Sequence, residues 1–186
     1  MFQYCPSCAS KKIKSQKNRF HCPDCEFVYF QNTAAATGCV IDTGDTVALL
    51  VRGNEPAKGK LDLPGGFVDP GEGILISLLR ELREELGWEP PIPPGKPLET
   101  YFTLFASFPN TYVYRDVPYN TCDIFFFLLA PEFKQAELKL EEGEVAEIRF
   151  VRPEDINLDD LAFDSTRRAM EAFISYKIPK KTESGK

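Results

Sequence analysis

The sequence has no long apolar run and only one histidine among its 186 residues. A membrane-spanning helix needs about eighteen or more consecutive apolar residues, and no stretch approaches that length. The first five residues, Met1 to Cys5, lack the basic and hydrophobic regions of a secretory signal. These absences predict a cytoplasmic protein with no membrane association.

Basic residues are fewer than acidic ones: the sequence has 22 lysines and arginines and 28 aspartates and glutamates. This balance argues against a protein that holds nucleic acid by phosphate neutralisation, so nucleic acid is not expected as a partner. Five basic and two acidic residues fall in residues 1–30, which leaves 17 basic and 26 acidic residues, a net charge of −9, for the rest. A polyanionic substrate bound there would need a metal ion as intermediary.

Residues 1–31 contain few apolar side chains, so burial alone cannot hold this segment together. Two Cys-x-x-Cys pairs lie in it: Cys5, Cys8, Cys22 and Cys25. Four thiolates at this spacing predict a closed tetrahedral site for structural zinc, with a rubredoxin-like iron site or two disulfides as alternatives. His21 is expected at the surface, because four cysteines already fill the ligand shell. Cys39 and Cys122 lie in apolar strands and are predicted to be buried and inert.

The composition changes after this segment and predicts one main domain over residues 32–177, followed by a disordered tail over residues 178–186. Apolar runs predict strands at residues 33–42, 46–52, 101–108, 112–115, 122–130 and 146–151, the first two joined by a hairpin turn at residues 43–45. Helical periodicity predicts a helix from Ile74 to Leu86 that ends at Gly87 and buries Leu75, Leu79, Leu82 and Leu86. A last helix, beginning near Asp164 or Ser165, is predicted to bury Ala169, Phe173 and Tyr176.

Three glutamates, Glu81, Glu84 and Glu85, lie on one face of the first predicted helix, roughly opposite its leucines. Like charges at this spacing repel one another, and a divalent cation would convert that repulsion into binding. Carboxylate oxygens suit magnesium, which takes the rest of its shell from water and substrate phosphates. The simpler interpretation is an ordinary solvated face, which is the usual reason for a glutamate cluster on an amphipathic helix.

The surroundings of these glutamates favour the metal site. The stretch from Gly66 to Trp88 resembles the Nudix box and matches it at every fixed position: Gly66, Glu72, Arg80, Glu81, Leu82, Glu84, Glu85, Gly87 and Trp88. From average residue usage, a chance match has a probability on the order of 10⁻⁹ per starting position. The resemblance implies an α/β fold, in which a mixed β-sheet is sandwiched between helices and the box holds a divalent metal against a pyrophosphate.

Roles for the box residues follow from this resemblance and from their chemistry. We expect Glu81, Glu84 and Glu85 to bind magnesium or manganese, with the Gly66 carbonyl as a further ligand implied by the family. Arg80 is expected to pair with Glu84 or Glu72 and orient the carboxylates. Gly65 and Gly66 would let the backbone approach the metal and the phosphates closely.

The general base is less narrowly predicted, because family members differ in which carboxylate performs this step. Glu85 is one candidate. The acidic loop before the last predicted strand offers others in Glu141, Glu142 and Glu144, and a solvated acidic turn is the alternative interpretation of that loop.

A zinc ribbon ahead of a Nudix domain resembles the NADH pyrophosphatase branch and a branch acting on flavin adenine dinucleotide or ADP-ribose. The NADH branch carries a Ser-Gln-Pro-Trp-Pro-Phe-Pro array, whereas residues 106–112 here read Ala-Ser-Phe-Pro-Asn-Thr-Tyr. Dinucleotide cleavage is therefore expected without NADH specificity. Four aromatic residues are candidates for a wall that stacks on a nucleobase, with ordinary sheet packing as the alternative: Phe108, Tyr112, Tyr114 and Tyr119.

The sequence thus predicts a magnesium-dependent pyrophosphohydrolase whose partner is a small nucleotide. It would cleave a nucleoside diphosphate linked to a second group, such as ADP-ribose, NADH or flavin adenine dinucleotide, into a mononucleotide and a phosphorylated fragment. One alternative is a pyrophosphatase that removes damaged nucleoside triphosphates. Another is a nucleotide sensor without catalysis, in which the zinc ribbon binds a partner. The resemblance is also compatible with a homodimer.

Overall fold

The computed structural model describes residues 3–177, so the predicted disordered tail lies outside the described residues. Contacts divide the chain into two compact units, residues 1–33 and residues 34–186. The domain boundaries expected from the sequence, at residues 31 and 177, remain a prediction. Between residues 3 and 177, no helix is long and apolar enough to cross a membrane.

The N-terminal unit is a small antiparallel sheet of three short strands, β1 (Lys14–Gln16), β2 (Arg19–His21) and β3 (Val28–Phe30). Of its described residues, only Cys5, Phe20 and Cys22 are buried. Two of these three are cysteines of the predicted metal site. The unit therefore has almost no apolar core, as its composition predicted.

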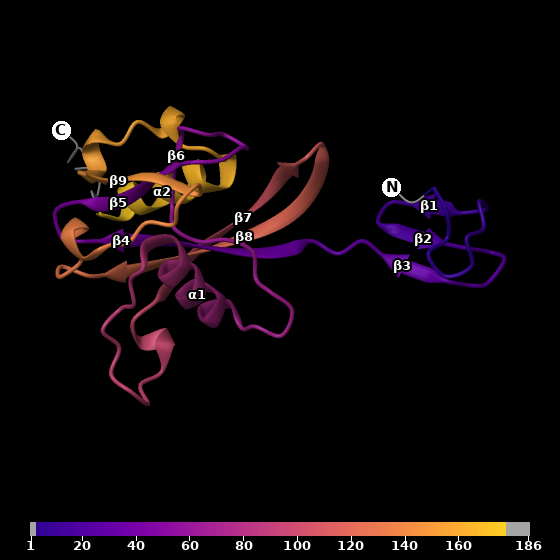
Figure 1. The fold of residues 1–186 in the computed structure, drawn as a ribbon, viewed down its shortest axis with the longest axis horizontal. Coiled ribbons are helices and arrows are strands. Elements are labelled where there is room, and N and C mark those ends of the chain that lie inside the picture. Colours follow the sequence, from indigo (N-terminus) through magenta and orange to yellow (C-terminus); the bar gives the residue numbers. More distant parts are fainter. Residues whose placement is uncertain (1–2, 178–186) are drawn as a thin grey trace, which may run out of the picture. The chain divides into compact units, whose positions relative to one another are not determined.

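The second unit is built on a six-stranded mixed sheet (Figure 1). Its strands are β4 (Ala34–Asp42), β5 (Val47–Arg52), β6 (Leu61–Asp62), β7 (Thr103–Tyr114), β8 (Val117–Leu129) and β9 (Val145–Val151). The order is β6-β5-β4-β8-β7, and β9 pairs with β5. Only β4 and β8 run parallel, while the other neighbours are antiparallel. The predicted mixed sheet is confirmed.

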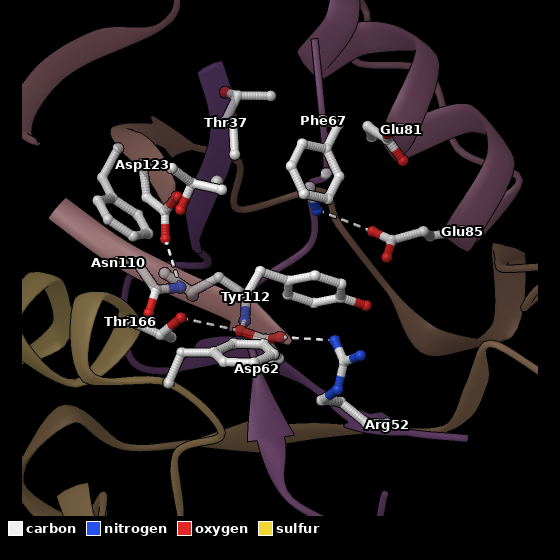
Figure 2. Close-up of a pocket in the computed structure, with 18 of the residues that line it drawn as sticks. Thr37, Arg52, Asp62, Phe67, Glu81, Glu85, Asn110, Tyr112, Asp123 and Thr166 are labelled. Carbon is white, nitrogen blue, oxygen red and sulfur yellow. Dashed lines mark hydrogen bonds and ion pairs between the residues drawn. The ribbon is translucent and has the colours of Figure 1, made fainter. Parts of the chain in front are cut away.

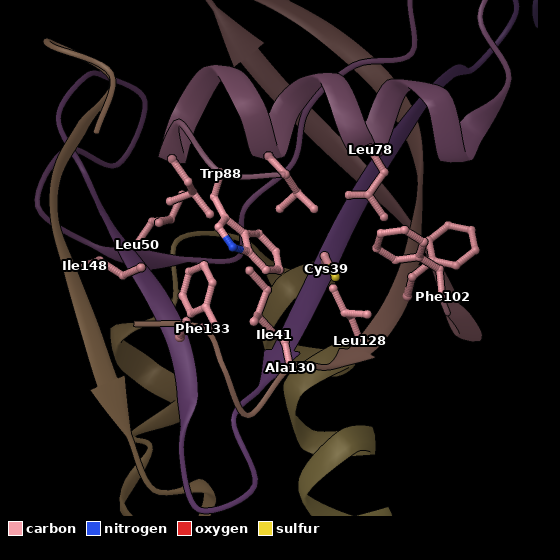
Figure 3. Packing of buried hydrophobic residues seen from close by; sticks show 14 of the residues in the cluster. Cys39, Ile41, Leu50, Leu78, Trp88, Phe102, Leu128, Ala130, Phe133 and Ile148 are labelled. Carbon is pink, nitrogen blue, oxygen red and sulfur yellow. The ribbon is translucent and has the colours of Figure 1, made fainter. Parts of the chain in front are cut away.

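The two α-helices, α1 (Ile74–Leu86) and α2 (Asp164–Lys177), cover opposite faces of this sheet. Leu78, Trp88 and Phe133 pack between α1 and one face, together with inward residues of β4 and β8 (Figure 3). Ala169, Met170 and Phe173 of α2 pack against the other face. The predicted sandwich of sheet and helices is therefore confirmed. Four short 3₁₀ helices lie in the connections: η1 (Leu98–Thr100), η2 (Gln135–Glu137), η3 (Pro153–Asp155) and η4 (Leu158–Asp160).

Helix α1 has the bounds predicted from the sequence. It ends at Gly87, whose φ of 60° is left-handed and whose N–H bonds the Arg83 carbonyl. The predicted buried stripe is wrong at one position, because Leu79 is only partly buried while Leu78 is fully buried. The stripe that faces the sheet follows Leu75, Leu78, Leu82 and Leu86, and Leu79 lies on its flank.

The two strands predicted at residues 101–108 and 112–115 are in fact one strand, β7. Pro109 lies within it, and this is compatible with pairing because β7 is the last strand in the sheet order and pairs only with β8. β8 starts five residues before its predicted beginning. Arg115 and Asp116, with φ of 47° and 65°, form the two-residue turn that joins the strands.

Two predicted burials are wrong. Tyr176 is 73% exposed, because it lies at the rim of the sheet, where one side of its ring faces Phe127. Met170 of α2 is buried instead. Cys122 is exposed, since strand alternation places it on the opposite face of β8 from the buried Thr121 and Asp123. Cys39 is buried as predicted, and burial raises the pKa of its thiol.

Candidate active site

The loop before α1 is held against strand β4. The Thr37 N–H donates to the Gly66 carbonyl at 2.8 Å, and the Cys39 N–H donates to the Pro64 carbonyl at 2.9 Å. Gly65 has a φ of +143°, and a Cβ there would lie 2.1 Å from the Thr37 carbonyl oxygen. Only glycine therefore fits at this position.

We expect Gly65→Ala to lower the free energy of unfolding by at least about 2 kcal/mol, because the new methyl group meets backbone atoms that cannot move aside. Gly73→Ala is the matched control, since a Cβ at Gly73 meets no atom within 4 Å and its φ is −84°. Urea denaturation of both variants measures the difference. Equal stabilities would contradict the close packing of the loop on β4.

The same glycine connects the loop to the carboxylate helix. The Gly65 N–H donates to a carboxylate oxygen of Glu85 at 2.8 Å (Figure 2). Gly66 lies against the side chain of Glu81. A Cβ added to Gly66 would be 2.6 Å from a Glu81 carboxylate oxygen. The absence of side chains at these two positions makes room for the two carboxylates beside the backbone.

Arg80 links one carboxylate of the preceding loop to two carboxylates of the helix. Its guanidinium donates to Glu72 at 3.1 Å, to Glu81 at 2.8 Å and to Glu84 at 2.9 Å. It also donates to the Phe67 carbonyl at 3.0 Å. The predicted pairing of Arg80 with Glu72 and Glu84 is thus present, and its hydrogen bond holds the pKa of Glu72 below the ordinary value.

Glu85 and Glu81 form the acidic centre of the site. Burial raises the pKa of Glu85 well above its ordinary value, and the neighbouring carboxylates of Glu81, Asp62 and Glu144 raise it further. Burial also raises the pKa of Glu81, although Arg80 opposes that shift. Negative charge collected at such a desolvated place favours a bound cation.

The cavity beside these carboxylates offers oxygen donors for a divalent cation, although among residues 3–177 only the four cysteines already lie close enough together to hold a metal ion. This cavity is lined by Glu81, Glu85, Glu144 and Gly66. Their oxygen atoms are hard donors of the kind magnesium prefers. Glu84 does not line this cavity, and its half-exposed carboxylate is directed toward Arg80. Metal binding through Glu84 would therefore require this carboxylate to leave Arg80.

The cleft beside the glutamates has two lobes (Figure 2 shows the first). The first has a volume of about 350 Å³ and extends along the sheet toward α2. The second has a volume of about 690 Å³ and extends toward the β7–β8 turn and the loop after β5. The two lobes share four lining residues: Arg52, Glu85, Tyr112 and Glu144.

The predicted aromatic wall is only partly present. Tyr112 lines both lobes and Tyr114 lines the second. Phe108 lines neither, because its ring packs beside Phe125 with the Arg168 guanidinium 4.2 Å from its centre. Tyr119 also lines neither lobe and is 44% exposed.

Several lining residues were not predicted. A partly buried ion pair joins Arg52 to Asp62 at 2.9 Å, and Thr166 donates to Asp62 at 3.0 Å. Polar residues of β7 and β8 and two phenylalanines complete the first lobe: Asn110, Thr121, Asp123, Phe67 and Phe163. Polar residues inside otherwise apolar strands were the available signal, but the register that brings them together is not visible in the sequence.

The four N-terminal cysteines converge. Their sulfur atoms all lie within 4.8 Å of one another, with 3.6 Å between Cys5 and Cys25 and 3.7 Å between Cys8 and Cys22. A tetrahedron with zinc–sulfur bonds of 2.3 Å has sulfur–sulfur edges of about 3.8 Å, so the cluster fits zinc. All four are free cysteines, and His21 bonds Glu26 at 3.0 Å outside the cluster.

The second unit is an α/β domain in which a mixed sheet lies between two helices. A glycine loop folds onto a carboxylate helix beside a cleft with two lobes. The model of the NUDIX domain matches residues 32–173. The chain belongs to this family.

Comparisons with individual proteins agree. An ADP-ribose pyrophosphatase from Methanocaldococcus jannaschii is 36% identical over 63 residues, 34% of this chain and 37% of that protein. An NAD-capped RNA hydrolase, NudC, from Deinococcus radiodurans is 23% identical over 91% of this chain and 55% of its own length. The NUDIX domain of Shewanella oneidensis NrtR, solved with ADP ribose, has a TM-score of 0.60 at 22% identity, over 85% of this chain and 94% of that domain. This chain thus spans about a third to about half of these two curated relatives.

Proposed function

We propose that the protein is a metal-dependent pyrophosphohydrolase that cleaves a diphosphate linking a nucleoside to a second bulky group. The observation that carries this proposal is the cleft with two lobes on either side of Glu85 and Glu144. A diphosphate bound at these carboxylates would place one attached group in each lobe. ADP-ribose and dinucleotides such as NADH or flavin adenine dinucleotide have this form.

The comparisons support this proposal. The relatives include an ADP-ribose pyrophosphatase and NAD-capped RNA hydrolases, whose names specify a diphosphate joined to groups at both ends. The missing proline-rich array, together with the short alignments, leaves the second group open among these compounds.

In the proposed reaction, Glu81 and Glu85 would hold a magnesium or manganese ion, with Glu84 and the Gly66 carbonyl as further ligands. The ion would supply positive charge that neutralises the diphosphate and lowers the pKa of the attacking water. Arg80 fixes the carboxylates of Glu72 and Glu81 through its hydrogen bonds.

Charge and position suggest roles for two residues that both lobes share. Arg52 is held in place by Asp62 and faces the ring of Phe163 at 4.9 Å, which leaves a fixed positive charge between the lobes for a phosphate. Glu144 lines both lobes and is a candidate general base beside Glu85. The Glu144 carbonyl accepts from the Gly53 N–H at 2.7 Å, which fixes the backbone of the acidic loop near the site.

Two other functions make different predictions. A pyrophosphatase that removes damaged nucleoside triphosphates would release inorganic pyrophosphate and would need only one lobe for a base and sugar. A nucleotide sensor would bind a ligand without cleaving it, although the chain retains every carboxylate of the box. The two lobes favour the first proposal over the triphosphate pyrophosphatase, and the retained carboxylates favour it over the sensor.

A substrate panel tests the proposal. We expect purified protein with magnesium to cleave at least one of ADP-ribose, NADH and flavin adenine dinucleotide at least tenfold faster than any nucleoside triphosphate. Chromatography should show a mononucleotide and a phosphorylated fragment. Release of pyrophosphate from triphosphates as the fastest reaction would favour the second function, and tight binding without any cleavage would favour the sensor.

A further inference from the structure

One face of the β7–β8 pair carries a polar group inside the first lobe. Asn110 of β7 pairs directly with Thr121 of β8, and Asp123 follows on the same face of β8 two residues later. All three line the first lobe, which α2 borders through Thr166. Figure 2 shows Asn110 and Asp123 side by side, joined by a hydrogen bond.

Asp123 is held in one orientation by its neighbours. One of its carboxylate oxygens, Oδ2, accepts from Asn110 Nδ2 at 3.0 Å and from Ser165 Oγ at 2.5 Å. Asp123 is 9% exposed and lines the first lobe, so its carboxylate, which can accept more than these two hydrogen bonds, can also accept one from a ligand in the lobe.

Thr121 has a buried hydroxyl with no protein partner. The residue is 2% exposed, and its Oγ1 is one of two buried side-chain oxygens in residues 3–177 that make no hydrogen bond. A buried hydroxyl without a partner is destabilising, so its presence points to a ligand that satisfies it. Thr37 of β4 carries the other such oxygen and also lines the first lobe (Figure 2).

Aromatic rings surround this polar group. Tyr112 lies on the same face of β7 as Asn110. Its ring contacts Phe67 edge-on at 5.4 Å and Phe163 at 5.6 Å. Aromatic rings and this polar group therefore line the lobe together with its charged residues, and rings beside hydrogen-bonding groups suit a planar heterocycle with polar atoms along one edge.

We propose that the first lobe binds a planar, nitrogen-containing ring that bears an NH₂ group beside an acceptor atom, with Asp123 accepting from the NH₂ group and the Thr121 hydroxyl donating to the acceptor. This inference rests on the proposed function, because it assigns one end of the substrate to a lobe. Adenine carries these groups as its amino group and ring nitrogen, and nicotinamide carries them in its carboxamide. The second lobe would then take the group at the other end of the diphosphate.

Binding of nucleosides without metal tests this assignment. Adenosine, inosine and nicotinamide riboside lack the diphosphate, so their dissociation constants can be measured in EDTA by ligand-observed NMR, independently of cleavage. The variants are Thr121→Val, which removes only the hydroxyl, and Thr121→Ser, which keeps it. Thr111→Val makes the same change at an exposed position of β7 outside the lobe.

We expect Thr121→Val to weaken binding about tenfold, while Thr121→Ser and Thr111→Val stay within about twofold of the wild type. Adenosine bound more tightly than inosine, in which a carbonyl replaces the amino group, would identify a nucleobase as the ring. Preferential binding of nicotinamide riboside would identify the carboxamide, and either result supports the proposal.

Equal binding by Thr121→Val and the wild type, or no binding of any of the three nucleosides, would overturn it. Neither result bears on cleavage of the diphosphate, which the substrate panel measures separately. Conversely, a protein that cleaves nothing but binds adenosine through Thr121 would retain the ring site and lose the proposed reaction.

Discussion

Glu85→Gln is expected to lower kcat/KM for the diphosphate substrate by about 10²- to 10⁴-fold. Glutamine has the shape of glutamate and can still accept the hydrogen bond from the Gly65 N–H. It lacks the negative charge, which the proposed reaction needs either to bind the cation or to accept a proton from water. The loss should therefore come from chemistry, with the fold unchanged.

The matched control is Glu89→Gln, which changes an exposed glutamate just beyond α1 and should leave kcat/KM unchanged. Comparison with Glu144→Gln separates the two roles of Glu85. Glu144→Gln should lower kcat as strongly as Glu85→Gln, with unchanged manganese affinity, if Glu144 is the general base. Manganese affinity by electron paramagnetic resonance should fall only for the variant that removes a ligand. Activity of Glu85→Gln within threefold of the wild type would exclude Glu85 from both roles.

Local signals in the sequence were sufficient for the carboxylate helix and its loop. Three signals predicted the helix Ile74–Leu86 with its bounds: the leucine period, the glutamates one turn apart and the glycine at position 87. All three depend only on residues that are close in the sequence. The contact between Gly65 and Glu85 joins the residue just before the box to the helix inside it. For this reason, the positions of these residues were predictable without the rest of the fold.

The first lobe was not predictable in the same way. Asn110, Thr121 and Asp123 meet only because β7 and β8 pair in one register, which depends on the turn at Arg115 and Asp116. The sequence interpretation ended one strand at Phe108 and so separated these residues. Side-chain packing was equally hidden: Phe108 lies on the same face of β7 as Asn110 and Tyr112, but its ring packs beside Phe125 and does not line the cleft.

The other large effect is expected in the N-terminal unit, where Cys5→Ser should abolish the fold of residues 5–30. Only three of its described residues are buried, so the proposed metal must supply most of the stability. Structural zinc sites contribute apparent binding free energies of about 10–16 kcal/mol, far more than this unit can gain from burying Phe20. Loss of one thiolate ligand should therefore leave the unit unfolded.

Amide NMR spectra measure this loss directly. In Cys5→Ser, and in the wild type treated with a strong chelator, signals of residues 5–30 should collapse to unfolded positions while those of the NUDIX domain stay dispersed. Cys122→Ser is the matched control, because Cys122 is exposed on β8 and lies outside the cluster. Metal analysis should find one zinc per wild-type chain, whereas iron would indicate the rubredoxin-like alternative. Dispersed signals for residues 5–30 in Cys5→Ser after chelation would show that the unit folds without metal, and the proposed structural role would then be wrong.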